Sequence, residues 1–324
     1  MEQQLGLRQL GQSNLMVSPL GLGTWQFSKG KGLVGKYWTN LSDEDIRQIV
    51  KVSLEGGINW IDTAEIYGKG ESEKAVARAL KSIGIKPGEV MIATKWWPAF
   101  RFASNIEHTI DQRREALDGY PIDLYQIHQP ISFSSIPDEM NSMGRMAKQG
   151  KFRYIGVSNY SAAKMERAYE ELGRYGLRLT SNQVHYNLLN RKIERNGILA
   201  KAKELGISII AYSPLAQGLL TGKFHDNPGL IMNTGIRKNL PGFSRKGLEK
   251  SRALIGKLKE IGARYNATPA QVALNWLITF HGDTVVAIPG ATKISHAQDN
   301  VGAMKFRLTL DELRAIDSAS LACE

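Results

Sequence analysis

The hydrophobic and polar positions of the chain follow two alternating patterns almost from end to end. Short apolar or β-branched runs, typical of buried strands, are separated by longer stretches with the amphipathic spacing of helices. The runs predict eight strands, at residues 19–25, 59–64, 90–95, 123–128, 152–158, 181–186, 208–213 and 284–290. Of the intervening segments, 42–57 has the clearest helix signals, because Ser42 can cap it, three acidic residues follow, and Gly56 or Gly57 can end it.

Repeated strand and helix units of this kind indicate an α/β protein with a parallel sheet. Eight units in 324 residues close most economically into a (β/α)8 barrel, the TIM barrel. An open doubly wound sheet is the alternative, but "GLGTW" after the first strand lacks the full glycine fingerprint, and a ribose-binding acid is missing at the required spacing. Two short runs within 7–20 predict an N-terminal β-hairpin on the barrel floor, and the long loop 214–249 after strand 7 is expected to be functional.

Composition and charge narrow the picture further. With 42% hydrophobic residues and no low-complexity linker, residues 1–324 are predicted to form one domain. The net charge of +11 could attract nucleic acid, anionic lipid or a phosphorylated small molecule, but the basic residues lie in mixed-charge segments and no nucleic-acid-binding motif occurs. A single cysteine, Cys323, excludes intramolecular disulfides and a cysteine-based zinc site, and no metal is expected.

The expected location is the cytoplasm, without a membrane partner. The N-terminus has no apolar core of signal-peptide length, and no run of about 18 apolar residues occurs. The oligomeric state is left open by these patterns.

Four titratable residues of different types end consecutive predicted strands. The second strand leads to Asp62 and then Tyr67, the third ends at Lys95 and the fourth at His128. In a parallel barrel these ends form the catalytic face. Each of these residues alone more often has a structural role, but together they suit proton transfer to a carbonyl oxygen. The ammonium of Lys95 would lower the pKa of the Tyr67 acid from about 10, and the carboxylate of Asp62 would hold the ammonium in place. The imidazole of His128 would orient the carbonyl. The hydride must come from a cofactor, because no side chain supplies one.

The segments "DTAEIYG", "QIHQP", "GVSNY", "SNQVHYNLLNR", "AYSPLAQGLLTGK" and "IPGATK" closely resemble those of the aldo-keto reductases, and the resemblance covers essentially the whole chain. It implies a (β/α)8 barrel, a nicotinamide dinucleotide bound without a Rossmann fold, and a catalytic tetrad of Asp62, Tyr67, Lys95 and His128. The residues of these segments resemble those of bacterial, cyanobacterial and plastid members, and of the β subunits of potassium channels, more than those of aldose reductases.

The resemblance also implies the cofactor contacts. Near the reactive end these are Gly23, Thr24, Trp25 and Asp62. At the nicotinamide they are Ser158, Asn159 and Gln183 on the carboxamide, with Tyr212 stacked on the ring. At the pyrophosphate they are Ser213, Leu215, Ala216, Gln217 and Lys223. At the adenosine and its 2′-phosphate they are Gly290, Thr292, Lys293, His296, Asp299 and Asn300.

Two positions depart from the family pattern at the adenosine end. His296 stands where many members have Arg or Gln, and Gly290 stands where many have Lys. A neutral histidine gives no charge to a phosphate, so Lys293 and Arg237 would have to compensate. NADP(H) is therefore the expected cofactor, with NAD(H) as the alternative.

The pocket walls are expected to come from three segments, 29–38, 96–102 and 129–134, because no long enclosing tail follows "LTLDELRAIDSAS". Trp25, Trp96, Trp97 and His128 are the predicted substrate contacts, with Phe100 or Trp38 as further candidates. The sequence thus predicts an NADP-dependent reductase that prefers flat, partly apolar aldehydes and ketones. Two alternatives are a redox-sensing subunit that holds its cofactor and turns over slowly, and a reductase dedicated to one cyclic aldehyde such as pyridoxal.

Overall fold

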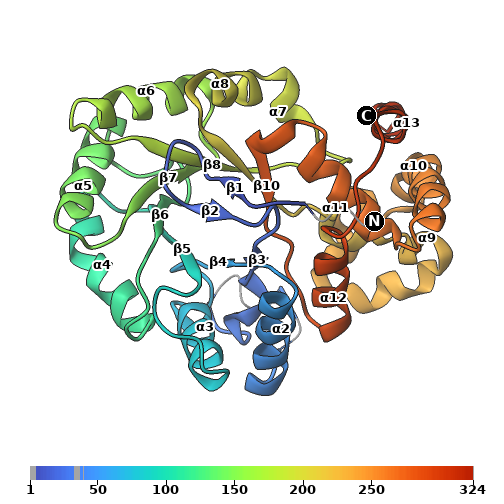
Figure 1. Ribbon diagram of the computed structural model, residues 1–324, viewed down its shortest axis with the longest axis horizontal. Coiled ribbons are helices and arrows are strands. Elements are labelled where there is room, and N and C mark those ends of the chain that lie inside the picture. Colours follow the sequence, from blue (N-terminus) through green and yellow to red (C-terminus); the bar gives the residue numbers. More distant parts are fainter. Residues whose placement is uncertain (1–4, 33–36, 39, 324) are drawn as a thin grey trace.

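A closed ring of parallel strands forms the centre of the structure, a computed structural model that describes residues 5–32, 37–38 and 40–323 (Figure 1). Within these residues the ring has eight strands in chain order, β3 (Leu22–Gly23), β4 (Trp60–Asp62), β5 (Met91–Trp96), β6 (Leu124–Ile127), β7 (Tyr154–Ser158), β8 (Leu179–His185), β9 (Ser208–Tyr212) and β10 (Val285–Ala287). Parallel bridges from Leu20 to Ala287 and from Gly23 to Gly290 join the first strand to the last. The predicted (β/α)8 barrel is therefore confirmed.

Helices surround the ring and follow the strands in the predicted order. They are α2 (Asp43–Glu55), α3 (Glu71–Ser82), α4 (Ser104–Ala116), α5 (Ile136–Lys148), α6 (Ala162–Gly173), α7 (Lys192–Arg195), α8 (Ile198–Leu205), α9 (Lys223–Asp226), α10 (Arg245–Arg264), α11 (Pro269–Thr279), α12 (Ile294–Gly302) and α13 (Leu310–Leu321). Helix α2 begins as predicted, because the Ser42 hydroxyl accepts a hydrogen bond from the backbone N–H of Asp45 at 3.0 Å. None of the helices in the described residues is long and apolar enough to cross a membrane.

The predicted hairpin closes one end of the barrel. Strands β1 (Arg8–Gln9) and β2 (Met16–Val17) pair antiparallel and cross the centre of the ring in Figure 1. Around them, Leu10, Leu15 and Val17 belong to one apolar cluster with inward-facing residues of the barrel strands. The backbone N–H of Gly11 also donates to the Ser208 hydroxyl at 2.7 Å. Since the hairpin covers the amino ends of the strands, the carboxyl ends remain for a site.

Strand periodicity places polar side chains directly above this apolar layer. Residues two apart on a strand point to the same side, so the apolar layer is followed inside the barrel by a polar one. The steps are Trp60 to Asp62, Ala93 to Lys95, Leu124 to Gln126 and Ile210 to Tyr212. The buried polar groups therefore gather at the carboxyl ends, on the side away from the hairpin.

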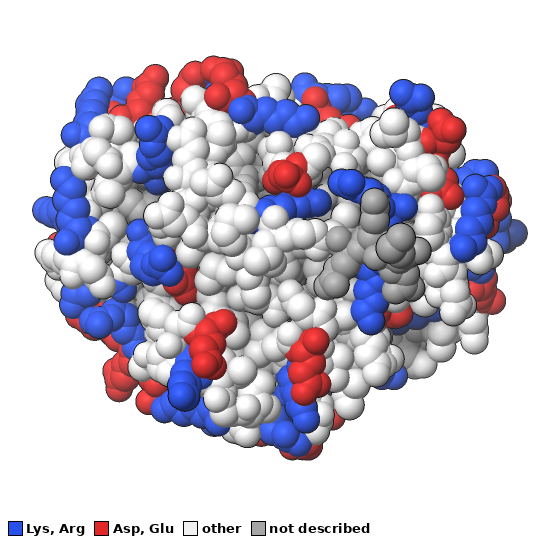
Figure 2. Space-filling view, viewed as in Figure 1, with Lys and Arg blue, Asp and Glu red and all other residues white. Residues whose placement is uncertain are grey.

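The long segment after β9 is folded rather than open. It contains the 3-10 segments Ala216–Thr221, Pro228–Asn239 and Pro241–Phe243 as well as α9. Four buried apolar side chains, Leu219, Phe224, Phe243 and Leu248, hold it together. Two shorter 3-10 segments, Trp25–Ser28 and Gly282–Thr284, flank the first and last strands. On the face shown in Figure 2, basic and acidic side chains are interspersed, as is usual for a solvated surface.

Candidate active site

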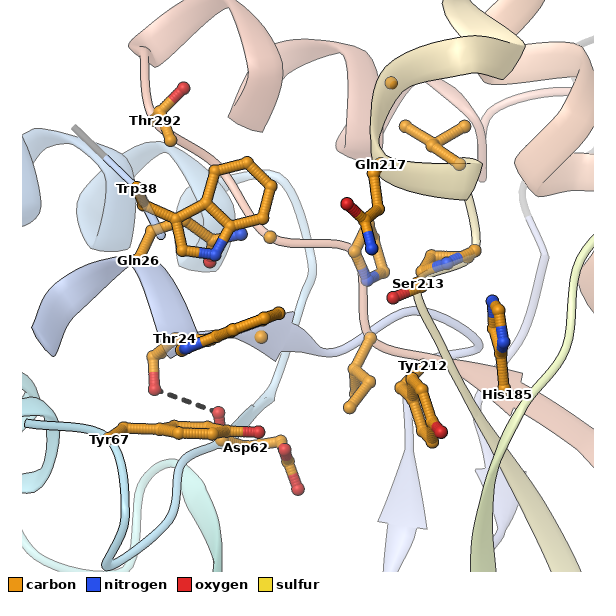
Figure 3. A pocket seen from close by; sticks show the side chains of 18 of the residues that line it. Thr24, Gln26, Trp38, Asp62, Tyr67, His185, Tyr212, Ser213, Gln217 and Thr292 are labelled. Atoms are coloured by element: carbon orange, nitrogen blue, oxygen red, sulfur yellow. Dashed lines mark hydrogen bonds between the residues drawn. The ribbon is translucent and has the colours of Figure 1, made fainter. Parts of the chain in front are cut away.

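A cavity of about 550 Å³ opens at the carboxyl ends of the strands (Figure 3). Its lining includes most of the residues that the sequence assigned to a site: Gly23, Thr24, Trp25, Asp62, Tyr67, Trp97, His128, Ser158, Asn159, Gln183, Tyr212, Ser213, Leu215, Gln217, Lys223, Arg237, Gly290, Thr292, His296, Asp299 and Asn300. In Figure 3, Tyr67 and Asp62 lie on one side, opposite Tyr212, while Trp38, Gln217 and Thr292 lie further along. The cavity thus brings together side chains from the first strand to the last.

Lys95 and Asp62 form a buried ion pair beneath this cavity. The Lys95 side chain is fully buried, and its Nζ donates to Asp62 Oδ1 at 2.5 Å and to the Thr63 carbonyl at 2.9 Å. The second carboxylate oxygen, Asp62 Oδ2, accepts from Gln126 Nε2 at 3.1 Å and from Gln183 Nε2 at 3.0 Å. A buried charge pair is tolerated when its remaining hydrogen-bonding capacity is satisfied. The two glutamine amides satisfy it here, although the sequence signalled no role for Gln126.

Tyr67 lies between the ion pair and the open cavity, with Lys95 Nζ at 5.1 Å from the centre of its ring. Burial raises the pKa of the Tyr67 hydroxyl above 10, the ammonium of Lys95 opposes that rise, and the charge of Asp62 adds to it. Lys95 lowers this pKa as expected, through its charge and a side-chain hydrogen bond. Desolvation outweighs that effect, so the net shift of the pKa is upward and Tyr67 keeps its proton at neutral pH.

His128 faces the same point as Tyr67. The two rings meet edge to face with their centres 5.7 Å apart, and the Trp97 ring is likewise edge to face with the imidazole, at 5.2 Å between centres. Burial, with a smaller contribution from Lys95, holds the pKa of His128 well below its usual value. The imidazole is therefore neutral near pH 7, and one of its nitrogens carries a hydrogen that can be donated.

Amide and hydroxyl groups form the opposite wall. The Tyr212 hydroxyl donates to Asn159 Oδ1 at 3.0 Å, and Asn159 Nδ2 donates to the Ser158 hydroxyl at 3.0 Å. The ring of His185 stacks against Tyr212 at 5.3 Å and also lines the cavity. Sequence reasoning did not identify His185, since its stacking on Tyr212 depends on the pairing of β8 with β9.

Three cations converge at the far end of the cavity. Burial and the charges of Arg237 and Lys293 lower the pKa of Lys223. Burial, Lys223 and Lys293 likewise lower the pKa of His296, so this ring is neutral near pH 7. Like charges held together in a cavity favour an anion between them. Of the residues assigned to the cofactor, Lys293 and Ala216 do not line the cavity themselves.

The side chain of Gln26 explains why residue 290 is a glycine and not the lysine of the family pattern. A Cβ atom at Gly290 would lie 2.3 Å from the side-chain amide of Gln26, which lines the cavity at this point. A lysine at this position would have to displace that amide. The amide of Gln26 thus stands where many aldo-keto reductases have a lysine, and sequence reasoning had not identified it.

Several cavity-lining polar atoms are suited to a polar ligand. Within the described part of the chain, four of them are buried without a hydrogen-bond partner, Gln26 Oε1, Trp38 Nε1, His128 Nδ1 and Asn300 Nδ2. Buried polar groups in proteins are nearly always paired. Together with the three cations, these atoms fit a long ligand with amide, hydroxyl and phosphate groups, as a nicotinamide dinucleotide has.

Trp96 and Phe100, two of the predicted substrate contacts, lie outside the cavity. Trp96 is fully buried outside the cavity, and its indole Nε1 donates to Asn105 Oδ1 of α4 at 3.0 Å. The prediction that Trp96 contacts substrate is therefore wrong, because β5 extends through Trp96 and successive side chains point to opposite faces: Lys95 inward, Trp96 outward. Phe100 does not line the cavity either.

Trp38 does line the cavity, as one of the two further candidates. Its ring meets Trp25 edge to face at 5.7 Å, while Tyr37 stacks on Trp25 at 4.8 Å. The guanidinium of Arg237 lies 4.6 Å from the centre of the Trp38 ring. Part of the predicted wall 29–38, residues 33–36, lies outside the described residues.

Comparisons with known proteins show which family and which solved structures this chain is similar to. The sequence matches the model of the Aldo/keto reductase family over residues 19–321. An uncharacterized oxidoreductase of Mycobacterium tuberculosis is 38% identical over 311 residues, covering 94% of this chain and 90% of the relative. The chloroplastic pyridoxal reductase of Arabidopsis thaliana is 34% identical over 319 residues, covering 94% and 84%. The solved structure of a glycerol dehydrogenase from Gluconobacter oxydans has a TM-score of 0.81 at 28% identity, covering 97% of this chain and 94% of that one.

Proposed function

Because the chain belongs to the aldo/keto reductase family, we propose that it is an NADP-dependent reductase of aldehydes and ketones. One observation carries this proposal. A protonated Tyr67, backed by the buried pair of Lys95 and Asp62, faces a neutral His128 at the cavity. Each group has the protonation state that carbonyl reduction needs, an acid, a fixed cation beneath it and a neutral hydrogen-bond donor.

In the proposed mechanism Tyr67 gives its hydroxyl proton to the carbonyl oxygen as negative charge develops there. Lys95 then lies close enough to stabilise the phenolate that remains, and it stays in place because Asp62 is held by two glutamine amides. His128 donates a hydrogen bond to the same oxygen and fixes the carbonyl in the plane that the proton transfer requires. The dinucleotide, when bound, supplies the hydride to the carbonyl carbon.

The chain's own residues suggest how that dinucleotide would be held. Ser158, Asn159 and Gln183 present amide and hydroxyl groups for a carboxamide, and Tyr212 presents a flat ring beside them. At the other end Lys223, Arg237 and Lys293 would hold phosphates, with Gln26 and Asn300 offering unpaired polar atoms. A third phosphate would relieve the repulsion among these cations, which supports NADP(H) over NAD(H).

A carbonyl panel tests the proposal directly. NADPH absorbance would be followed with 4-nitrobenzaldehyde, methylglyoxal, isatin, pyridoxal and glucose, and we expect rapid multiple turnover with the activated carbonyls. Pyridoxal is included because one relative is a pyridoxal reductase. A kcat/KM for pyridoxal far above that for 4-nitrobenzaldehyde would make the protein a dedicated enzyme. Tight NADPH binding without turnover of any carbonyl would contradict the proposal and favour a redox-sensing subunit.

A further inference from the structure

His185 and Tyr212 form a stacked pair at the wall of the cavity. Their ring centres lie 5.3 Å apart, and the planes of the two rings differ by only 8°. The parallel register of β8 and β9 sets these two residues opposite each other. In Figure 3 the Tyr212 ring lies between His185 and the side of the cavity that holds Tyr67. The imidazole therefore covers one face of Tyr212, and the other face is directed to the cavity.

Asn187 determines which hydrogen the imidazole of His185 can carry. Asn187 Oδ1 accepts from the backbone N–H of Leu189 at 2.9 Å, and its Nδ2 donates to the Ser213 carbonyl at 2.9 Å, so the orientation of this amide is fixed. The same Nδ2 lies 3.2 Å from His185 Nε2. An amide nitrogen can only donate, so Nε2 must be the acceptor of this hydrogen bond and carries no hydrogen itself.

Asn190 meets the other nitrogen of the same ring. Its side-chain amide lies 2.8 Å from His185 Nδ1, and Asn190 Oδ1 is buried without a hydrogen-bond partner among the described residues. The two ends of an amide have nearly the same shape, so this amide can turn its oxygen toward Nδ1. The Nδ1–H group then donates to Asn190 Oδ1, and both groups are satisfied. The neighbours of His185 thus select one neutral tautomer.

The surroundings of His185 also oppose a positive charge on its ring. Desolvation by the groups packed around the imidazole, and then the charge of Lys192 on α7, lower the pKa of His185. A second proton would set an N–H of the imidazolium against the N–H of Asn187 Nδ2, and two donors repel each other. A neutral ring therefore backs Tyr212, and the electron-rich face of the phenol ring stays available to a positively charged ligand.

We propose that His185 is a positioning residue, which holds the Tyr212 ring from behind and, by staying neutral, allows Tyr212 to bind the oxidised as well as the reduced nicotinamide. This inference rests on the proposed function, in which Tyr212 stacks on that ring. The oxidised nicotinamide carries a positive charge and the reduced one carries none. A cation behind Tyr212 would therefore weaken the binding of NADP⁺ selectively, so His185 influences the relative affinity for the two forms of the cofactor.

Substitutions at this one position test the inference, with the dissociation constants of NADPH and NADP⁺ measured by fluorescence titration. His185→Ala removes the ring, so both constants should rise at least about threefold. His185→Phe restores an uncharged ring and should recover most of that loss. His185→Arg keeps a planar group but gives it a permanent charge, so the ratio of the NADP⁺ constant to the NADPH constant should rise at least about fivefold over that of His185→Phe. His108→Arg is the matched control, because it adds the same charge at an exposed histidine of α4, and it should leave the ratio unchanged.

The tautomer can be measured in the unmodified protein. A long-range proton–nitrogen correlation spectrum, with the signal of His185 assigned by its absence in His185→Phe, should show a hydrogen on Nδ1 and none on Nε2 from about pH 6 to 8. A hydrogen on Nε2, a ratio for His185→Arg that matches the ratio for His185→Phe, or a rise of less than about threefold in His185→Ala would each overturn the inference. Failure of the wild-type protein to bind either cofactor, or to reduce any carbonyl of the panel, would instead contradict the proposed function itself.

Discussion

Tyr67 differs from phenylalanine only by the oxygen whose proton the proposed mechanism transfers. Tyr67→Phe keeps the ring that packs beside Lys95, so kcat should fall by roughly 100-fold or more while NADPH affinity stays near wild type. Steady-state kinetics with 4-nitrobenzaldehyde and a cofactor titration check both parts. Turnover retained within about threefold would show that another group supplies the proton.

The pH dependence of kcat/KM shows whether burial or the charge of Lys95 has the larger effect on the pKa of Tyr67. Because burial holds the pKa of Tyr67 above its ordinary value of about 10, the acid remains protonated through neutral pH. The value of kcat/KM for reduction should therefore stay flat from about pH 6.5 to 9 and fall only at higher pH. A midpoint near pH 7 to 8, absent in Tyr67→Phe, would mean that the ammonium dominates after all.

Gln126 supports Asp62 with one of the two amide hydrogen bonds to Oδ2. Gln126→Leu preserves most of the side-chain volume and removes this donor to a buried charge, so kcat should fall about tenfold, in line with a charge-assisted hydrogen bond. Gln149→Leu, at the end of α5, is the control. Equal kinetics in the two variants would leave Asp62 dependent on Gln183 alone.

At the scale of the element, the end of β5 makes the sharpest comparison, because Trp96 and Trp97 are adjacent but face different surroundings. Trp97→Ala should change the ratio of kcat/KM for 4-nitrobenzaldehyde to that for glucose by more than about threefold, or roughly 0.7 kcal/mol. Trp96→Ala should leave the ratio intact and lower the free energy of unfolding by about 3–5 kcal/mol, as for other buried aromatics. Urea unfolding and the kinetic ratio are measured on both variants. They test whether Trp97 acts in the cavity and Trp96 in the core.

At the scale of the whole molecule, the proposed cofactor site depends on cations from separate segments. If Lys223, Arg237 and Lys293 jointly hold a 2′-phosphate and the pyrophosphate, NADPH should bind more tightly than NADH, and raising the salt concentration should shrink the preference. Lys293→Met should reduce the preference, whereas Lys238→Met in the long segment after β9 serves as the control. Equal dissociation constants at low salt would mean that His296 and Gly290 have removed the selectivity.

Much of the barrel and of its catalytic rim could be predicted from local sequence patterns. The period of two within each apolar run, together with the chain order of parallel strands, determines that Asp62, Lys95 and His128 end up on one rim. The predicted strand ended at Lys95, whereas β5 runs one residue further, through Trp96, and this difference gave Trp96 the wrong role. Gln26 and His185 carried no local signal, because their neighbours Gly290 and Tyr212 are distant in sequence or lie on another strand.

The sequence by itself determined the order of the elements, the candidate for the proton-transfer group and the family motifs, because each depends on spacing along the chain. Only the tertiary structure decided that burial outweighs Lys95 at Tyr67, and that Lys223, Arg237 and Lys293 converge. These properties depend on how much water each group loses and on distances between segments far apart in the chain. Desolvation and Coulomb energy follow from packing, which no local window of residues contains.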